Sequence, residues 1–147
     1  MKLILEQKEG IETEIVIRFG LMDERLARLV ESIRAQQFSL AMKCKGELFA
    51  VLPEQILYLE SVDGKTFAYT AAEVYESTQS LQTIEAKLGN CGFVRISKSC
   101  LLNVSALVSI APLWNQRYEA KLKNGEKVVV NRHYIGALKQ KLGITEE

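Results

Sequence analysis

The sequence predicts an α+β fold that is mainly β, in which an N-terminal ββα arm precedes an elongated antiparallel β-sheet domain with one short helix and a C-terminal helix. Three observations predict it. Residues 1–38 combine strand and helix periodicity, residues 39–147 hold many short strand-like runs between turn residues, and two helical stretches interrupt or end those runs. Short strands spaced this densely favour antiparallel pairing, because tight turns can join antiparallel neighbours.

The arm at residues 1–38 alternates first and becomes helical afterwards. Residues 2–7 form a strand-like run, a Lys-Glu-Gly turn follows, and residues 11–19 place one face on alternate positions: Ile11, Thr13, Ile15, Ile17 and Phe19. Period two predicts a strand. Helical spacing then predicts an amphipathic helix with a stripe formed by Met22, Leu26, Leu29, Val30 and Ile33. We expect this stripe to pack on the arm's own hairpin. A dimer contact is the alternative and can coexist with that packing, in which case the arm would serve dimerisation or docking.

Residues 39–147 carry the strands of the main domain. We expect strands near residues 40–44, 48–52, 56–60, 66–70, 74–77, 93–96, 107–111, 118–122 and 127–130. Asp63-Gly64 and Asn124-Gly125 supply the positive backbone dihedrals that tight hairpins need. Helices are expected at residues 80–88, before the Gly89-Asn90 stop, and at residues 133–142.

Composition excludes several classes of protein. With 48% hydrophobic and 25% charged residues, the 147-residue chain is typical of a globular protein with a real core. Its three cysteines form no CxxC pair, so neither a disulfide framework nor a zinc cluster is expected. No stretch is apolar for long enough to be a signal peptide or to span a bilayer, and we therefore expect a cytoplasmic protein without membrane insertion.

The sequence contains few residues arranged as in an enzyme active site. The single histidine, His133, stands at an expected helix start, and no HExxH, GxSxG, phosphate-loop or GxGxxG pattern occurs. The acidic residues are scattered, and Glu73 and Glu76 fit surface charges better than a catalytic pair. We predict no enzyme activity, no catalytic residues, no metal and no cofactor.

The charges divide unevenly along the chain. Residues 46–90 hold two basic and seven acidic side chains, whereas residues 91–141 hold nine basic and two acidic ones. The net charge of +1 conceals this asymmetry. A positive second half indicates either a polyanion-binding face or ordinary surface lysines.

Candidate contacts to nucleic acid lie on turns and strand ends. They are Lys65 and Thr66 in the Asp-Gly hairpin, Arg95, Ser97, Lys98 and Ser99 in the VRISKSC run, Arg117 at a strand start, and Asn131 and Arg132 after the last strand. Singly, each is equally consistent with a solvated loop residue. Together they supply lysines and hydroxyls for phosphates, and an arginine and an asparagine for base edges. Since neither helix carries cations suited to a recognition helix, loops would have to read the DNA.

The chain closely resembles the LytTR-type DNA-binding domain of bacterial transcription regulators. Three motifs, in this order, show the resemblance: ILYLESVDGKTFAYTAAEVYES, FVRISKSCLLNVSALVSI and RYEAKLKNGEKVVVNRHYIGALKQKLG. It covers about residues 40–143, and the short arm is similar to that of standalone members without a receiver domain. The resemblance implies packed β-sheets whose loops enter successive major grooves at paired direct repeats, commonly occupied by two copies. The family's base-reading positions fall on Lys65-Thr66, Lys98 and Arg132, while Asn131 and Gln116 stand where many relatives have Ser and Gly.

We therefore expect a sequence-specific DNA-binding transcriptional regulator that reads promoter direct repeats. In this interpretation Arg132 bonds both acceptors of a guanine, while Lys98 and Lys65 hold the backbone or touch bases. The expected partners are double-stranded DNA, a second copy on that DNA and a separately encoded regulatory partner. The main alternative is a protein-interaction module whose basic loops bind an acidic partner.

Overall fold

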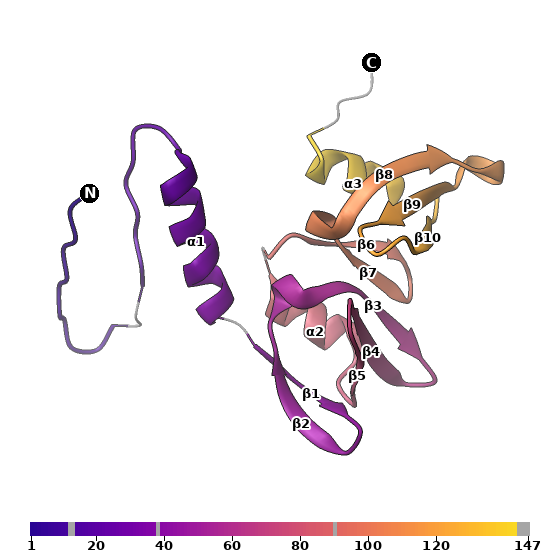
Figure 1. Ribbon diagram of the computed structural model, residues 1–147, viewed down its shortest axis with the longest axis horizontal. Helices are drawn as coiled ribbons and strands as arrows, with labels where there is room; N and C mark the ends of the chain where they lie inside the picture. Colours follow the sequence, from indigo (N-terminus) through magenta and orange to yellow (C-terminus); the bar gives the residue numbers. More distant parts are fainter. Residues whose placement is uncertain (12–13, 38, 90, 144–147) are drawn as a thin grey trace.

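The computed structural model describes residues 1–11, 14–37, 39–89 and 91–143 (Figure 1). Expectations that fall on Thr13, Phe38, Asn90 and residues 144–147 lie outside the described residues. One helix, α1 (Glu24–Gln37), precedes a body of two antiparallel sheets and two further helices. The predicted α+β fold, mainly β, is confirmed. Within the described ranges, no helix is long and apolar enough to cross a bilayer.

The larger sheet has seven antiparallel strands in the order β2-β1-β5-β4-β3-β7-β6. Their bounds in that order are β2 (Glu47–Val51), β1 (Leu40–Cys44), β5 (Val74–Ser77), β4 (Lys65–Thr70), β3 (Ile56–Val62), β7 (Cys100–Asn103) and β6 (Phe93–Ser97). Asp63 and Gly64 join β3 to β4 with φ values of 51° and 78°. Two successive left-handed residues match the right-handed twist of a hairpin, which is why Asp-Gly is favoured there. The predicted hairpin is confirmed.

The smaller sheet has three antiparallel strands in the order β10-β9-β8: β10 (Lys127–Val130), β9 (Tyr118–Leu122) and β8 (Leu107–Pro112). The predicted hairpin at Asn124-Gly125 forms, but with a longer turn than at Asp63-Gly64. Only Gly125 has a positive φ, of 89°, and the Leu122 amide donates to the Glu126 carbonyl oxygen at 2.8 Å. Helix α3 (Ile135–Lys141) follows β10 and begins two residues later than predicted.

Two hydrophobic clusters hold the body together. Helix α2 (Leu81–Leu88) contributes Leu81, Ile84 and Leu88 to the first cluster, where they pack with residues of the larger sheet. Ser80 caps this helix by accepting a hydrogen bond of 3.1 Å from the Thr83 amide. The second cluster joins the smaller sheet and α3 to the larger sheet through residues such as Ile96, Leu122 and Leu138. The larger sheet is therefore the middle layer.

Strand β7 was not predicted, although it lies inside the larger sheet. All four of its residues are buried, because Leu101 belongs to the first cluster while Cys100 and Leu102 belong to the second. A strand covered on both faces shows no alternation of apolar and polar side chains. The periodicity that identified the other strands is consequently absent here.

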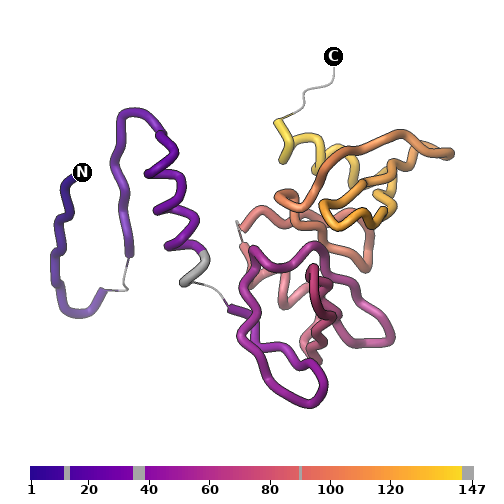
Figure 2. Tube along the Cα trace, in the orientation of Figure 1, coloured from indigo at the N-terminus to yellow at the C-terminus, as the bar shows by residue number. Residues whose placement is uncertain are grey.

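The two strands predicted before α1 are wrong, since the described residues of this segment form no strand. Figure 2 shows the segment as a trace that lies apart from the body and leads into α1. An isolated hairpin is marginal unless a third element covers its apolar face. That cover is missing here, since Ile15 is 58% exposed and Phe19 is 54% exposed. The predicted helix does form, but only Leu26 of its stripe is fully buried, and Leu26 belongs to neither core cluster.

Candidate nucleic-acid interface

Three turns of the body lie side by side at one edge. The Ser61 amide, beside the β3–β4 turn, donates a hydrogen bond of 2.8 Å to the carbonyl oxygen of Ser99 in the β6–β7 turn. The Asn131 amide, in the β10–α3 junction, donates one of 2.9 Å to the carbonyl oxygen of Ile96, near the same β6–β7 turn. Backbone bonds therefore link all three turns, whose tips are on the right in Figure 1.

The β8–β9 loop continues this row. Val130, the last residue of β10, pairs with Tyr118, the first residue of β9, so the loop before Tyr118 lies next to the β10–α3 junction. Arg117 is the last residue of that loop. We call this end of the molecule the basic edge and define it by its four cations, Lys65, Lys98, Arg117 and Arg132.

The four cations of the basic edge are exposed, and three are without an ion pair to any residue that the structure describes: Lys98, Arg117 and Arg132. The Nζ atom of Lys65 lies 3.9 Å from Oε2 of Glu76, and the two side chains are 57% and 45% exposed. Exposed pairs of this kind contribute little, because water and salt screen them. A polyanion can therefore compete for Lys65 as well.

Arg95 does not extend from the edge. Its Nε donates a hydrogen bond of 3.3 Å to Oε2 of Glu85 on α2, and its Nη1 donates to the carbonyl oxygen of Lys98. Its side chain is only 23% exposed. Arg95 thus connects α2 to the backbone of the β6–β7 turn at Lys98, and the direct DNA contact expected from the sequence stays a prediction.

Thr66 is also different from the expectation. It is fully buried, and its hydroxyl donates a hydrogen bond of 2.7 Å to the carbonyl oxygen of Gln79. A polar side chain without solvent exposure cannot meet a phosphate, so Thr66 holds β4 against the segment that leads into α2. Lys65 and Thr66 alternate across the strand, and only Lys65 faces outward.

The remaining candidates, Ser97, Ser99 and Asn131, either shape a turn or lie on the surface. The Ser97 hydroxyl oxygen accepts a hydrogen bond of 3.3 Å from the Ser99 amide, so Ser97 shapes the β6–β7 turn. Ser99 is exposed at the tip. Asn131 is half-buried, and its carbonyl oxygen accepts a hydrogen bond of 2.9 Å from the Tyr134 amide, which turns the chain into α3 beside Arg132.

One exposed residue of this edge was not identified from the sequence. Trp114, in the β8–β9 loop, is 85% exposed. A large aromatic residue is ordinarily expected to be buried at least in part. The sequence contains no signal for its exposure, because the flanking Leu113 and Asn115 resemble any strand-to-turn transition.

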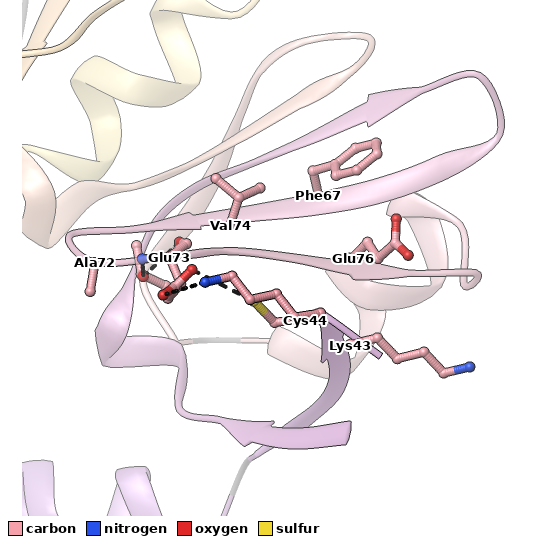
Figure 3. Close-up of a pocket in the computed structure, with 9 residues that line it drawn as sticks. Lys43, Cys44, Phe67, Ala72, Glu73, Val74 and Glu76 are labelled. Atoms are coloured by element: carbon pink, nitrogen blue, oxygen red, sulfur yellow. Dashed lines mark hydrogen bonds and ion pairs between the residues drawn. The ribbon is translucent and has the colours of Figure 1, made fainter. Parts of the chain in front are cut away.

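An open groove of about 520 Å³ lies elsewhere, between β1 and the β4–β5 pair (Figure 3). Two of its polar side chains pair with Glu73. The Cys44 thiol donates to Oε2 of Glu73 at 3.6 Å, and the Lys45 Nζ atom lies 3.8 Å from Oε1 of the same carboxylate. Removal from water and the Glu73 carboxylate raise the pKa of the Cys44 thiol, which makes this thiol a poor nucleophile. No group of metal ligands is found among the described residues.

The sequence of this domain matches a known family. A family of sequences described as the LytTr DNA-binding domain matches residues 46–143. The chain belongs to this LytTR family. The family is a class of DNA-binding domains and not of enzymes. Recognition from the three sequence motifs is confirmed.

Two relatives of this LytTR chain are named sensory transduction proteins. It is 33% identical over 112 residues to "Sensory transduction protein LytT" of Bacillus anthracis, covering 76% of this chain and 46% of that protein. It is 36% identical over 108 residues to the protein of the same name from Enterococcus faecalis, covering 71% and 44%. The chain thus spans less than half the length of these relatives.

A solved structure confirms the LytTR fold. The chain matches a LytTr DNA-binding domain from Bacillus cereus with a TM-score of 0.67 and 26% sequence identity. The match covers 72% of this chain and 97% of that domain. The two-sheet body described above is therefore the family's fold.

Proposed function

We propose that this LytTR chain is a transcriptional regulator that binds specific DNA sequences through the basic edge. The observation that carries the proposal is the backbone linkage of three turns through the Ser61–Ser99 and Asn131–Ile96 hydrogen bonds. Because the turns are fixed to one another, their cations meet a duplex as one surface. Such a regulator acts in the cytoplasm, where a bacterial chromosome lies.

The side chains of the basic edge suit different parts of DNA. Arg132, at a strand-to-helix junction, carries the planar donor pair that matches the two acceptors of guanine in the major groove. Lys65, Lys98 and Arg117 are exposed cations suited to phosphates, and Ser99 adds a hydroxyl. We assign base reading to Arg132, with Asn131 beside it, and backbone positioning to the others.

We further propose that the sites are paired direct repeats upstream of a promoter and that two copies occupy them. A single body presents one edge of four cations, which is a small contact for a specific DNA complex. A second copy on a neighbouring repeat doubles the contact.

Binding to a duplex from the chain's own upstream region tests the function. Fluorescence anisotropy of the labelled duplex, measured between about 50 and 200 mM salt, reports the number of phosphates contacted, since the logarithmic slope is about −0.9 per phosphate. We expect a slope of about −3 or steeper and a footprint of defined length. A shallow slope without a footprint, together with tight binding of an acidic protein, would instead support the protein-interaction alternative.

The N-terminal residues 1–38 are proposed to be a self-association arm. The chain exposes 10877 Å², whereas a compact monomer of 16.6 kDa exposes about 7,600 Å². If a second copy covered this excess of about 3,000 Å² on each chain, the dimer would bury about 6,000 Å² in total, which is at the upper end of what permanent dimers bury. Exposed apolar residues are concentrated in this arm, among them Leu5, Ile15, Phe19 and Leu29.

A second copy is the occupant that fits these observations. The arm carries six basic and seven acidic residues, so two arms do not repel each other strongly. The described residues before α1 form no strand, so a second identical segment can pair with their backbone groups. Sedimentation of the full chain should show a dimer that Leu29→Asp dissociates, while Leu48→Asp on β2 leaves it intact. A monomer throughout the micromolar range would contradict the proposal and favour a separately encoded partner.

A further inference from the structure

Trp114 is the most exposed aromatic residue of the basic edge. It is 85% exposed in the β8–β9 loop, between β8 and β9 of the smaller sheet. Scattered exposed apolar residues are ordinary on a protein surface. An indole ring is different, because it exposes a large apolar area that gains by contact with a ligand.

The loop presents Trp114 in a defined conformation. Asn115 and Gln116 are both left-handed, with φ values of 60° and 62°. Consecutive non-glycine residues in this region are unfavourable unless the surrounding structure enforces them. Here two backbone hydrogen bonds close the loop: the Leu113 amide donates to the Arg117 carbonyl oxygen at 2.7 Å, and the Arg117 amide donates to the Trp114 carbonyl oxygen at 3.3 Å.

The loop stands beside the base-reading position assigned above. Val130 pairs with Tyr118, so Arg117 and Trp114 lie just beyond the strand end that leads into Arg132. The tip of this loop extends on the same side as the other three turns (Figure 1). Arg117 is exposed and has no ion pair with a described residue.

We propose that Trp114 joins Arg117 in a fourth DNA contact, in which the indole packs on the backbone at one flank of the site beside the phosphate that Arg117 binds. This inference rests on the proposed function. A DNA backbone alternates apolar deoxyribose rings with phosphates, and an exposed indole three residues from an exposed guanidinium matches that alternation. The indole packs on the sugar face, while Arg117 bonds the adjacent phosphate. The contact adds affinity and length to the footprint without reading sequence.

The sole tryptophan makes the inference directly measurable, because tryptophan emission, excited at a wavelength that the five tyrosines do not absorb, reports on this loop alone. A titration with the cognate duplex is followed by Trp114 emission, by iodide quenching and by anisotropy of a label on the DNA. We expect emission to change and iodide access to fall several-fold at the same DNA concentration that saturates the anisotropy. Trp114→Ala should weaken binding by about tenfold and shorten the footprint at one flank. Leu48→Ala, at a 68% exposed apolar residue of β2, is the matched control and should change neither.

The outcomes separate this inference from the proposed function. If anisotropy shows DNA binding while Trp114 emission and iodide access stay unchanged, the fourth contact is wrong and the DNA-binding function stands. If no duplex binds, both are wrong. If Trp114 becomes protected on raising the protein concentration without DNA, the loop contacts a second copy, which also overturns the inference.

Discussion

The amide of Asn131 lies 2.9 Å from the carbonyl oxygen of Ile96 and donates a hydrogen bond to it. This bond connects the β10–α3 junction to the end of β6, two residues before Lys98. Arg132 and Lys98 come from different sheets, yet they share one edge because of it. The relationship turns separated basic residues into one surface.

Arg132→Ala should weaken specific DNA binding by about 1–3 kcal/mol and relax the preference at one base pair. The loss follows from removing a paired donor that faces guanine. Competition among duplexes that differ at single positions measures it. Lys123→Ala, an exposed cation at the opposite end of β9, is the matched control and should bind like the parent. Equal discrimination by both variants would remove Arg132 from base reading.

Lys98→Ala should lower binding to cognate and unrelated duplexes by similar factors. We expect the logarithmic salt slope to become shallower by about one unit, because one phosphate contact is lost. Anisotropy at four salt concentrations measures the slope. An unchanged slope would show that Lys98 does not touch the backbone.

Arg95→Ala should weaken DNA binding although Arg95 is largely buried. Its removal frees the carbonyl oxygen of Lys98 and breaks the bond to Glu85, so the β6–β7 turn loses its support. The effect should be smaller in a Lys98→Ala background, because both changes act on the same turn. Strict additivity in this double-mutant cycle would rule out the positioning role.

Thr66→Val should reduce stability and leave DNA affinity nearly unchanged. The variant keeps the shape but leaves the Gln79 carbonyl oxygen without its 2.7 Å donor, at a cost of about 1–3 kcal/mol. Urea unfolding measures the stability, and anisotropy on the folded variant measures the affinity. A large loss of affinity with unchanged stability would restore Thr66 as a DNA contact.

Stability should decline at alkaline pH, and Cys100 should contribute to the decline. Burial raises the pKa of the Cys100 thiol from 9.0 to about 12. The folded state therefore retains a proton that the unfolded state releases, so this contribution is complete below pH 9 and is lost as the pH rises towards 12. Urea midpoints at pH 8, 9 and 10 should fall for the parent and fall less for Cys100→Ala. A steeper fall in the variant would contradict this assignment.

Most strands were predictable because turn residues mark their ends, or because buried and exposed positions alternate along them, as in β1 and β9. Asp63-Gly64 shows this well, since its left-handed conformation was deduced from residue type alone. β7 was not predictable, because cover on both faces removes the alternation. The arm shows the converse error, since Ile15 and Phe19 alternate as in a strand but have no partner in the described chain.

The candidate site was predictable in part. Lys65, Lys98, Arg117 and Arg132 lie on turns, where sequence already placed them, and exposure follows from that position. The roles of Thr66 and Arg95 depend on which side of a strand faces α2 and on the partners Gln79 and Glu85. These two contacts join residues 13 and 10 positions apart in the sequence, and residue type alone does not indicate such partners.

The most direct test of the central claim is amide chemical-shift mapping of the labelled protein with its cognate duplex. We predict that the largest changes cluster at residues 63–65, 97–99, 114–117 and 131–133, the four tips of the basic edge. Amides of the β9–β10 turn at residues 123–126, at the opposite end of the smaller sheet, should hardly move. Saturable changes confined to that opposite turn or to α2, with the four tips unaffected, would contradict the account.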